Sequence, residues 1–208
     1  MVALAPGRAY ADCPSPYNGL TCGSLTPVCA LASQVWTCNV TGGASTAILT
    51  EDDDSAVMYE AWGSHNGTNF CCSVALGNTV TSIVLNGSSA ADTLKFTYLI
   101  GGNNLKAYTG TTITATINAG DCADGIGGSD DGTANYSETL HGDAGSDTIN
   151  AGDGDDYCYG DAEPDTINGM GGADVIYGGT QDDVCTGGGG RRHVRSRIWR
   201  RPREWWRR

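Results

Sequence analysis

The sequence has few of the residues from which a conventional hydrophobic core is built. Only 2 of its 208 residues are phenylalanine, whereas 31 are glycine. No run of 18 apolar residues occurs, so the sequence contains no candidate membrane-spanning helix. A large aliphatic or aromatic core would be difficult to build from this composition.

Basic residues are missing from a long central stretch. Residues 107–190 contain no lysine or arginine but 16 acidic residues. An acidic block of this density needs either water or bound cations around it. A nucleic-acid partner is not expected, because phosphate binding requires positive charge.

Catalytic motifs are also missing. The three histidines, His65, His141 and His193, do not have the H-E-x-x-H spacing of metalloproteases, and no G-x-S-x-G nucleophile elbow occurs. The sequence therefore gives no sign of an enzyme, and we expect a non-enzymatic protein.

Cysteine, in contrast, is plentiful, with nine residues that suggest an oxidising compartment. Cys13, Cys22, Cys29 and Cys38 are spaced 9, 7 and 9 residues apart, and Cys71-Cys72 follow. Six cysteines can form three disulfides in 15 ways, so the connectivity cannot be read from the sequence. The C-x-x-C pairs that zinc sites favour are absent, which makes disulfides the better interpretation.

The chain divides into segments of different composition. Ala9-Tyr10-Ala11 fits the pattern of a signal-peptidase site, so residues 1–11 are interpreted as a possible signal-peptide remnant and export is expected. Residues 12–77 form a Cys-rich segment of short strands and turns. Residues 78–118 are rich in β-branched residues and also predict strands.

From residue 119 onward the sequence repeats with a period of nine. The five uninterrupted nonamers of 142–186 are GDAGSDTIN, AGDGDDYCY, GDAEPDTIN, GMGGADVIY and GGTQDDVCT. Weaker copies precede them at 119–127 and 133–141, separated by the five-residue insertion GSDDG. The sixth position is always aspartate: Asp147, Asp156, Asp165, Asp174 and Asp183. The eighth position is Ile or Cys: Ile149, Cys158, Ile167, Ile176 and Cys185.

This pattern resembles the repeats-in-toxin nonapeptide G-G-x-G-x-D-x-U-x, in which U is a large apolar residue. The resemblance implies an all-β fold, with a parallel β-roll or β-solenoid over 119–190. In each repeat a six-residue turn precedes a three-residue strand whose middle residue points inward. Successive repeats reverse direction, so repeats 18 residues apart stack on the same side, about 4.8 Å apart.

The resemblance also implies Ca²⁺ as the cofactor. Calcium takes six to eight oxygen ligands, and in the family each ion lies between two stacked turns and uses the aspartate of both. Carried over, one ion joins Asp147 and Asp165, another joins Asp165 and Asp183, and a third joins Asp156 and Asp174. Asp124 contributes to a further, irregular site.

Several positions depart from the pattern. Glu163 and Gln181 replace the fourth-position glycine, and Pro164 follows Glu163, so ions on that side are expected to bind more weakly. Glu138 stands in place of aspartate and puts the turn of repeat 133–141 in doubt. Segments 87–95 and 110–118 are interpreted as decayed turns.

Two further expectations concern side chains of the repeat strands. Cys158 and Cys185 are expected to be small buried hydrophobes on opposite sheets, not a disulfide. Asn150 and Asn168 are expected to stack as a ladder.

The last 18 residues differ from everything before them. Residues 191–208 hold nine arginines and three of the five tryptophans, and we expect this basic tail to lie outside the fold. Such a composition is typical of a shifted GC-rich reading frame. The alternatives are a cationic tail that binds anionic membranes and a tail that lies across the acidic roll by charge attraction.

Together these patterns predict a calcium-dependent extracellular or cell-surface module with a role in surface attachment or matrix structure. One alternative is a fragment of a secreted repeats-in-toxin hydrolase or cytolysin. Another is a calcium-dependent binding protein whose ligand site lies in residues 12–118. The expected partners are calcium ions; no nucleic-acid partner is expected, and the sequence identifies no membrane or cell-surface ligand.

Overall fold

The described part of the chain consists of strands and turns. The computed structural model describes residues 29–40, 45–51, 57–65, 68–75, 80–98, 114–129, 137–189 and 193–195. Within these ranges there is no helix, and hence no helix that could cross a membrane. The all-β prediction is therefore confirmed for the described residues.

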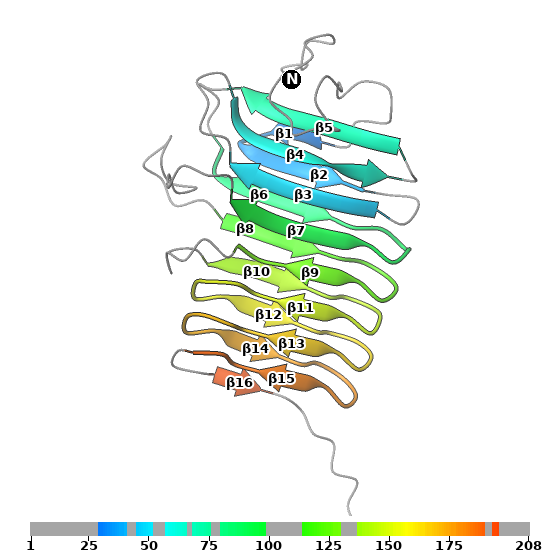
Figure 1. Ribbon diagram of the computed structural model, residues 1–208, viewed down its shortest axis with the longest axis vertical. Coiled ribbons are helices and arrows are strands. Elements are labelled where there is room, and N and C mark those ends of the chain that lie inside the picture. Colours follow the sequence, from blue (N-terminus) through cyan, green and yellow to red (C-terminus); the bar gives the residue numbers. More distant parts are fainter. Residues whose placement is uncertain are drawn as a thin grey trace, which may run out of the picture.

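In the described residues, sixteen strands follow one another (Figure 1). The first eight strands have four to nine residues each: β1 Cys29–Ala32, β2 Val35–Asn39, β3 Ser45–Glu51, β4 Val57–His65, β5 Thr68–Ala75, β6 Ser82–Asn86, β7 Thr93–Tyr98 and β8 Thr114–Asn118. The next eight are shorter: β9 Gly125–Gly127, β10 Glu138–His141, β11 Thr148–Asn150, β12 Tyr157–Tyr159, β13 Thr166–Asn168, β14 Val175–Tyr177, β15 Val184–Thr186 and β16 His193–Arg195.

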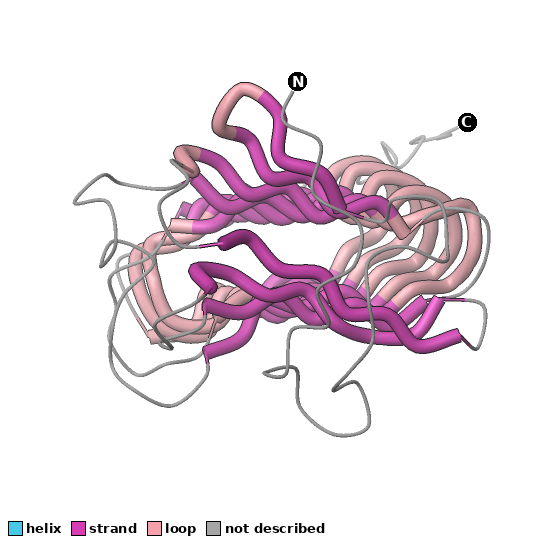
Figure 2. The backbone as a smooth tube through the Cα atoms, turned by 90° about the horizontal axis from the view of Figure 1, so that it is seen from above, coloured by secondary structure: helices cyan, strands magenta, loops and turns pink. Residues whose placement is uncertain are grey.

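The strands form two eight-stranded sheets, and from β6 onward the chain alternates between them. One sheet, called sheet A here, has the order β1-β2-β6-β8-β10-β12-β14-β16. The other, sheet B, has the order β15-β13-β11-β9-β7-β3-β4-β5. Figure 2 shows the two sheets as facing layers, with the turns along both sides.

Within the uninterrupted repeats, neighbouring strands are parallel and 18 residues apart. Ile149 lies opposite Ile167, and Cys158 lies opposite Ile176. The predicted 18-residue register is therefore confirmed. The five-residue insertion lengthens one step without shifting the phase, because Ile126 still lies opposite Ile149.

Each short strand buries its middle residue between the layers. Strands β11 to β14 have an inward residue that is fully buried, flanked by residues that face outward. Strand geometry requires this alternation, because successive side chains point to opposite faces. The inward residues form one continuous core with those of the first strands, among them Trp36, Leu85 and Leu94.

The N-terminal strands pair partly as antiparallel hairpins. Strands β1 and β2 form one hairpin, which Cys29 and Cys38 join as a disulfide between directly opposite residues. Strands β3, β4 and β5 form an antiparallel meander. Both units continue into the stack, because β2 pairs with β6 and β3 pairs with β7 in parallel. The hairpin and the meander therefore form the N-terminal end of the two sheets.

The segments interpreted as decayed turns also follow the repeat register. Leu94 at the eighth position of 87–95 lies opposite Ile126, and Ile117 of 110–118 lies opposite Leu140. Both side chains are buried. On sheet A, the Asn86 side chain donates a hydrogen bond to Asn39, and the Asn118 side chain donates one to Asn86, each over 2.8 Å. Asn150 and Asn168 lie in register as expected.

The C-terminal boundary expected at Gly190 needs correction. Strand β16 pairs in parallel with β14, and Val194 lies opposite Ile176 at the same 18-residue spacing. Residues 193–195, which the sequence assigned to the basic tail, therefore continue sheet A. The backbone keeps the register although Arg192 stands at the sixth position of this repeat. Two successive repeats, one in each sheet, are called a winding below. The remainder of 191–208 lies outside the described residues.

Cys158 and Cys185 have free thiols, as expected for small core residues. Cys158 is fully buried and Cys185 is partly buried. Burial raises the pKa of the Cys158 thiol strongly and that of Cys185 to about 11. A third free cysteine, Cys122, is exposed in a turn.

Candidate metal centre

The turns between the sheets share a backbone pattern in which the second and fourth positions have a positive φ. Glycines hold some of these positions, such as Gly172 at φ 112°. Other residues hold the rest, including Glu163 at φ 73° and Gln181 at φ 76°. Glu163 and Gln181 replace the glycine of the family pattern, yet their turns keep the same backbone conformation. Positive φ is unfavourable for residues with a side chain.

On the sheet B side, the sixth-position aspartates form a continuous column. Each carboxylate Oδ1 accepts a hydrogen bond from the backbone amide of the equivalent residue one winding earlier. Asp147 donates to Asp165 over 2.8 Å, and Asp165 donates to Asp183 over 3.1 Å. Asp124 belongs to this column, because its amide donates to Asp147 over 2.8 Å. The structure thus brings together all four predicted site residues on this side.

On the opposite side, a second column contains Glu138, Asp156 and Asp174. The Asp156 amide donates to Asp174 Oδ1 over 3.2 Å, and the Glu138 amide donates to Asp156 Oδ1 over 2.8 Å. The replacement of aspartate by Glu138 therefore does not disrupt the end of this turn, although the sequence put the turn in doubt. Glu138 is fully buried and takes the sixth-position place, where its carboxylate accepts hydrogen bonds from Ser129. The extra methylene of glutamate is accommodated because Ser129, at the start of the insertion, supplies donors.

The second oxygen of each aspartate carboxylate is buried without a donor. Among the described residues, nothing donates a hydrogen bond to Oδ2 of Asp124, Asp147, Asp156, Asp165, Asp174 or Asp183. An unpartnered buried carboxylate oxygen carries a large desolvation cost unless a proton or a cation neutralises it. Six such oxygens in two regular columns are therefore a strong indication of bound cations.

The first-position glycines help to explain how oxygen atoms gather around these carboxylates. A Cβ atom added to Gly142 would collide with Asp147 Oδ2 and would lie 2.9 Å from the carbonyl oxygen of Gly160. At Gly160 the same position is occupied by Asp165 Oδ2 and the carbonyl oxygen of Gly178. A carboxylate oxygen and a backbone carbonyl of the next winding thus converge on one small space, and these are the ligand types that calcium prefers.

Burial raises the carboxyl pKa of the six aspartates whose Oδ2 atom has no donor. The pKa of Asp124 and that of Asp165 rise to about 7, chiefly because burial disfavours the charged form. The pKa of Asp147 rises to about 6, and that of Asp156 rises to about 9, where the nearby Glu138 carboxylate adds to the effect of burial. Asp174 and Asp183 shift in the same direction. Without a cation, protons therefore compete for these sites near neutral pH.

The sheet B column ends at Asp92, which is satisfied by the protein itself. Asp92 donates its amide to Asp124 Oδ1 over 2.6 Å, so it occupies the place that precedes Asp124. Its own oxygens accept hydrogen bonds from the amides of Ser45 and Ser88 and from the Ser88 hydroxyl. The carboxylate of Asp92 thus uses hydrogen bonds where the later aspartates leave an oxygen unpartnered.

The structure places every predicted site residue in one of the two columns, but the repeat pattern missed two features. It did not indicate that the amide of each sixth residue binds the next carboxylate, because a pattern of side chains carries no information on backbone donors. It also overlooked Asp92, although the spacing of GSSAADTLK places aspartate at the sixth position.

Comparison with known proteins agrees with this geometry. Residues 133–167 and 159–193 match the model of the RTX calcium-binding nonapeptide repeat (4 copies). No curated protein and no solved structure matches the chain. Residues 133–193 are therefore RTX repeats, and repeats of this family bind calcium ions.

Proposed function

We propose that the described strands form a calcium-binding β-roll whose C-terminal half folds when calcium binds. The observation that carries the proposal is the set of six buried Oδ2 atoms that no described residue satisfies. A divalent cation between successive windings would neutralise these oxygens and hold the windings together. The family match to residues 133–193 supports calcium as that cation.

The geometry supports specific ligand pairs. Asp165 lies between Asp147 and Asp183 in one column, so it would serve an ion on each side. Asp156 and Asp174 form the corresponding pair in the other column. Asp124 extends the first column by one more site in register with Asp147. The insertion therefore does not interrupt the column, in contrast to the irregular site expected from the sequence.

Calcium should be needed for folding because the repeats carry so much negative charge. Residues 119–186 contain 16 acidic residues and no basic residue, and carboxylates of successive windings lie about 5 Å apart. In the absence of a cation their repulsion and burial oppose folding. The N-terminal strands, with the disulfide and the self-satisfied Asp92, do not depend on calcium in this way.

The biological role that fits these features is an exported, non-enzymatic module at a surface or in an extracellular matrix. Repeats of this family are generally structural, and proteins that contain them are typically secreted. The disulfide Cys29–Cys38 suits an oxidising compartment. The domain limits proposed from the sequence, a Cys-rich segment to residue 77 and strands to 118, lead into this roll.

A calcium titration followed by circular dichroism tests the proposal. The purified protein should gain β signal in millimolar calcium, relative to the same protein in chelator. Magnesium should not replace calcium, because it requires a smaller octahedral shell and loses water reluctantly. Equal β content in chelator and in calcium would refute calcium-dependent folding.

A further inference from the structure

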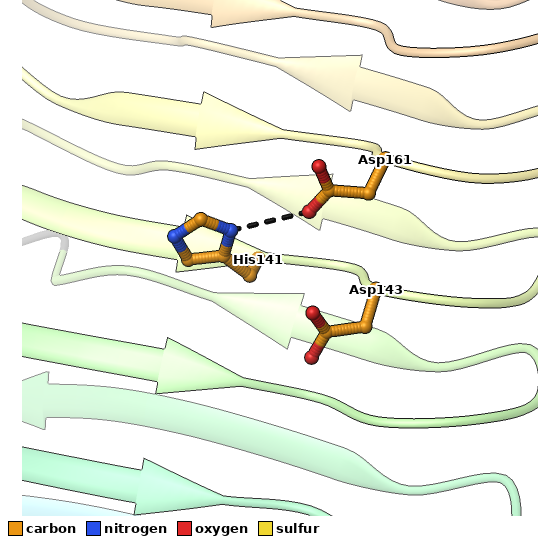
Figure 3. Close-up of side chains that lie close together, drawn as sticks. All are labelled: His141, Asp143 and Asp161. Carbon is orange, nitrogen blue, oxygen red and sulfur yellow. Dashed lines mark hydrogen bonds and ion pairs between the residues drawn. The ribbon is translucent and has the colours of Figure 1, made fainter.

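A second group of side chains with metal-ligand chemistry lies outside the two carboxylate columns. His141 ends β10, Asp143 is the second residue of the turn that follows, and Asp161 is the second residue of the next turn on the same side. Figure 3 shows the three side chains gathered across adjacent windings, with a hydrogen bond between His141 and Asp161. One ligand atom from each lies within 4.8 Å of the others, and all three side chains are partly buried.

The imidazole of His141 is held in place by an aromatic stack. Its ring lies parallel to that of Tyr159, with 4.5 Å between ring centroids, and Tyr159 stacks in turn on Tyr177 at 5.1 Å. At the edge of the ring, His141 Nδ1 lies 3.1 Å from Asp161 Oδ2. The ring is therefore oriented before any ligand arrives, which lowers the entropy lost on binding.

The two aspartates occur only where the histidine is. Among the described turns from residue 119 onward, the second position is glycine or methionine except at Asp143 and Asp161, which follow one another on the side that His141 borders. Asp143 is anchored by the amide of Gly120, which donates to its Oδ2 over 3.2 Å. These two carboxylates are thus distinct from the sixth-position aspartates and face the imidazole from two windings.

We propose that His141, Asp143 and Asp161 bind a divalent transition metal such as Zn²⁺, at a site separate from the calcium columns. One imidazole nitrogen and two carboxylates suit zinc, whereas calcium prefers oxygen ligands alone. Ligand atoms in a tetrahedral zinc site are roughly 3.3 Å apart. The partly exposed carboxylates would have to move inward to reach that spacing, and water would complete the shell.

This inference rests on the proposed function, because the site spans two windings. Asp161 belongs to the winding after His141 and Asp143, and the hydrogen bond from the Asp147 amide to Asp165 joins the same two windings. Calcium binding in the column therefore builds the second site. Zinc should bind the calcium-folded protein and not the protein in chelator-treated, metal-free form.

Cobalt(II) serves as a spectroscopic probe for the site. It is titrated into the full chain in excess calcium, so that the columns are filled, and visible absorption reports its coordination. We expect one equivalent to bind with a tetrahedral spectrum, to be displaced by Zn²⁺, and to bind at least about tenfold more weakly in His141→Gln and in Asp161→Asn. Asp182→Asn, which removes an exposed carboxylate from another turn, is the matched control and should leave binding unchanged.

When cobalt does bind, two outcomes would overturn the site. One is cobalt binding that is unaffected by His141→Gln. The other is a thiolate-to-metal absorption band that disappears in Cys122→Ser, which would assign the metal to the exposed cysteine. Circular dichroism of the same samples separates the two proposals: a protein that folds in calcium but binds no cobalt refutes the zinc site alone. Failure to fold in calcium refutes the proposed function itself.

Discussion

Replacement of Asp165 by asparagine tests the stacked-column assignment most directly. Asp165 is hydrogen-bonded in its column both to the winding before it and to the winding after it, through Asp147 and Asp183. Asparagine keeps the Oδ1 acceptor and replaces the charged Oδ2 by a neutral amide nitrogen, which is not a calcium ligand. We therefore expect Asp165→Asn to lose about two ions' worth of calcium binding. Asp183→Asn should lose about one, since it has an assigned partner on one side only.

The same substitution should have the opposite effect on the metal-free protein. Two unit charges about 5 Å apart repel by roughly 1 kcal/mol in water and about 3 kcal/mol at an intermediate dielectric. Asp165→Asn removes such a repulsion toward each of its two neighbours. The metal-free form should thus gain about 2 kcal/mol or more in stability relative to the parent chain at pH 8, where most of the carboxylates are charged. In chelator the variant should show more β signal than the parent.

Isothermal titration calorimetry at pH 8 measures the stoichiometry, and circular dichroism in chelator measures the metal-free fold. Asp182→Asn is again the control, because it removes an exposed acid that lies outside the column. Equal losses of calcium from the Asp165 and Asp183 variants would refute the stacked-column assignment. Lower β content of metal-free Asp165→Asn would refute the electrostatic argument.

Three further predictions follow from the described geometry. Burial raises the pKa of Asp124 to about 7, so the metal-free fold holds extra protons and becomes less stable as pH rises from about 4 to 7. Acidification in chelator should therefore increase the β signal, and the apparent calcium affinity should fall below pH 7. A calcium midpoint that is unchanged at pH 5.5 would contradict this prediction. Gly172→Ala places a side chain at φ 112° against the carbonyl of Gly154 and should destabilise the calcium-bound form by about 1–3 kcal/mol in thermal denaturation. Gly189→Ala should have little effect, because its Cβ would lie 3.7 Å from the nearest atom, the carbonyl oxygen of Met170. Equal losses of stability would be inconsistent with the turn geometry. In calcium, Cys122 should react with a thiol reagent while Cys158 stays protected, and mass spectrometry that found equal labelling would argue against the buried position of Cys158.

The periodic part of the fold was predictable because the residues at the sixth and eighth positions of the repeat each have a single structural role. Isoleucine or cysteine at the eighth position predicted the inward residue, and aspartate at the sixth position predicted the columns. The 18-residue register follows from these two facts, since a nonamer that reverses direction must return to the same sheet after two repeats. Residues such as Ile149 and Ile167 therefore lie where the pattern placed them.

The parts that were not predicted depend on contacts without periodic signals. Nothing in the spacing of the cysteines distinguished Cys29–Cys38 from other pairings, because a cross-strand disulfide requires knowledge of the hairpin register. Glu138 departed from the motif, yet a serine donor nearby lets it occupy the aspartate position. The meeting of His141 with Asp161 depends on two turns being stacked, which no local motif expresses.

The order of strands in the two sheets determines how the chain responds to mechanical force. From β8 to β14, each strand has its sheet neighbours two elements earlier and two elements later, so a pull on the C-terminal end loads one winding at a time. A released nonamer extends by about 30 Å, and unravelling should proceed as a staircase of such steps. Calcium between windings would raise the force of each step. The antiparallel hairpin closed by Cys29–Cys38 does not open in this way, because its two strands are joined covalently at opposite residues.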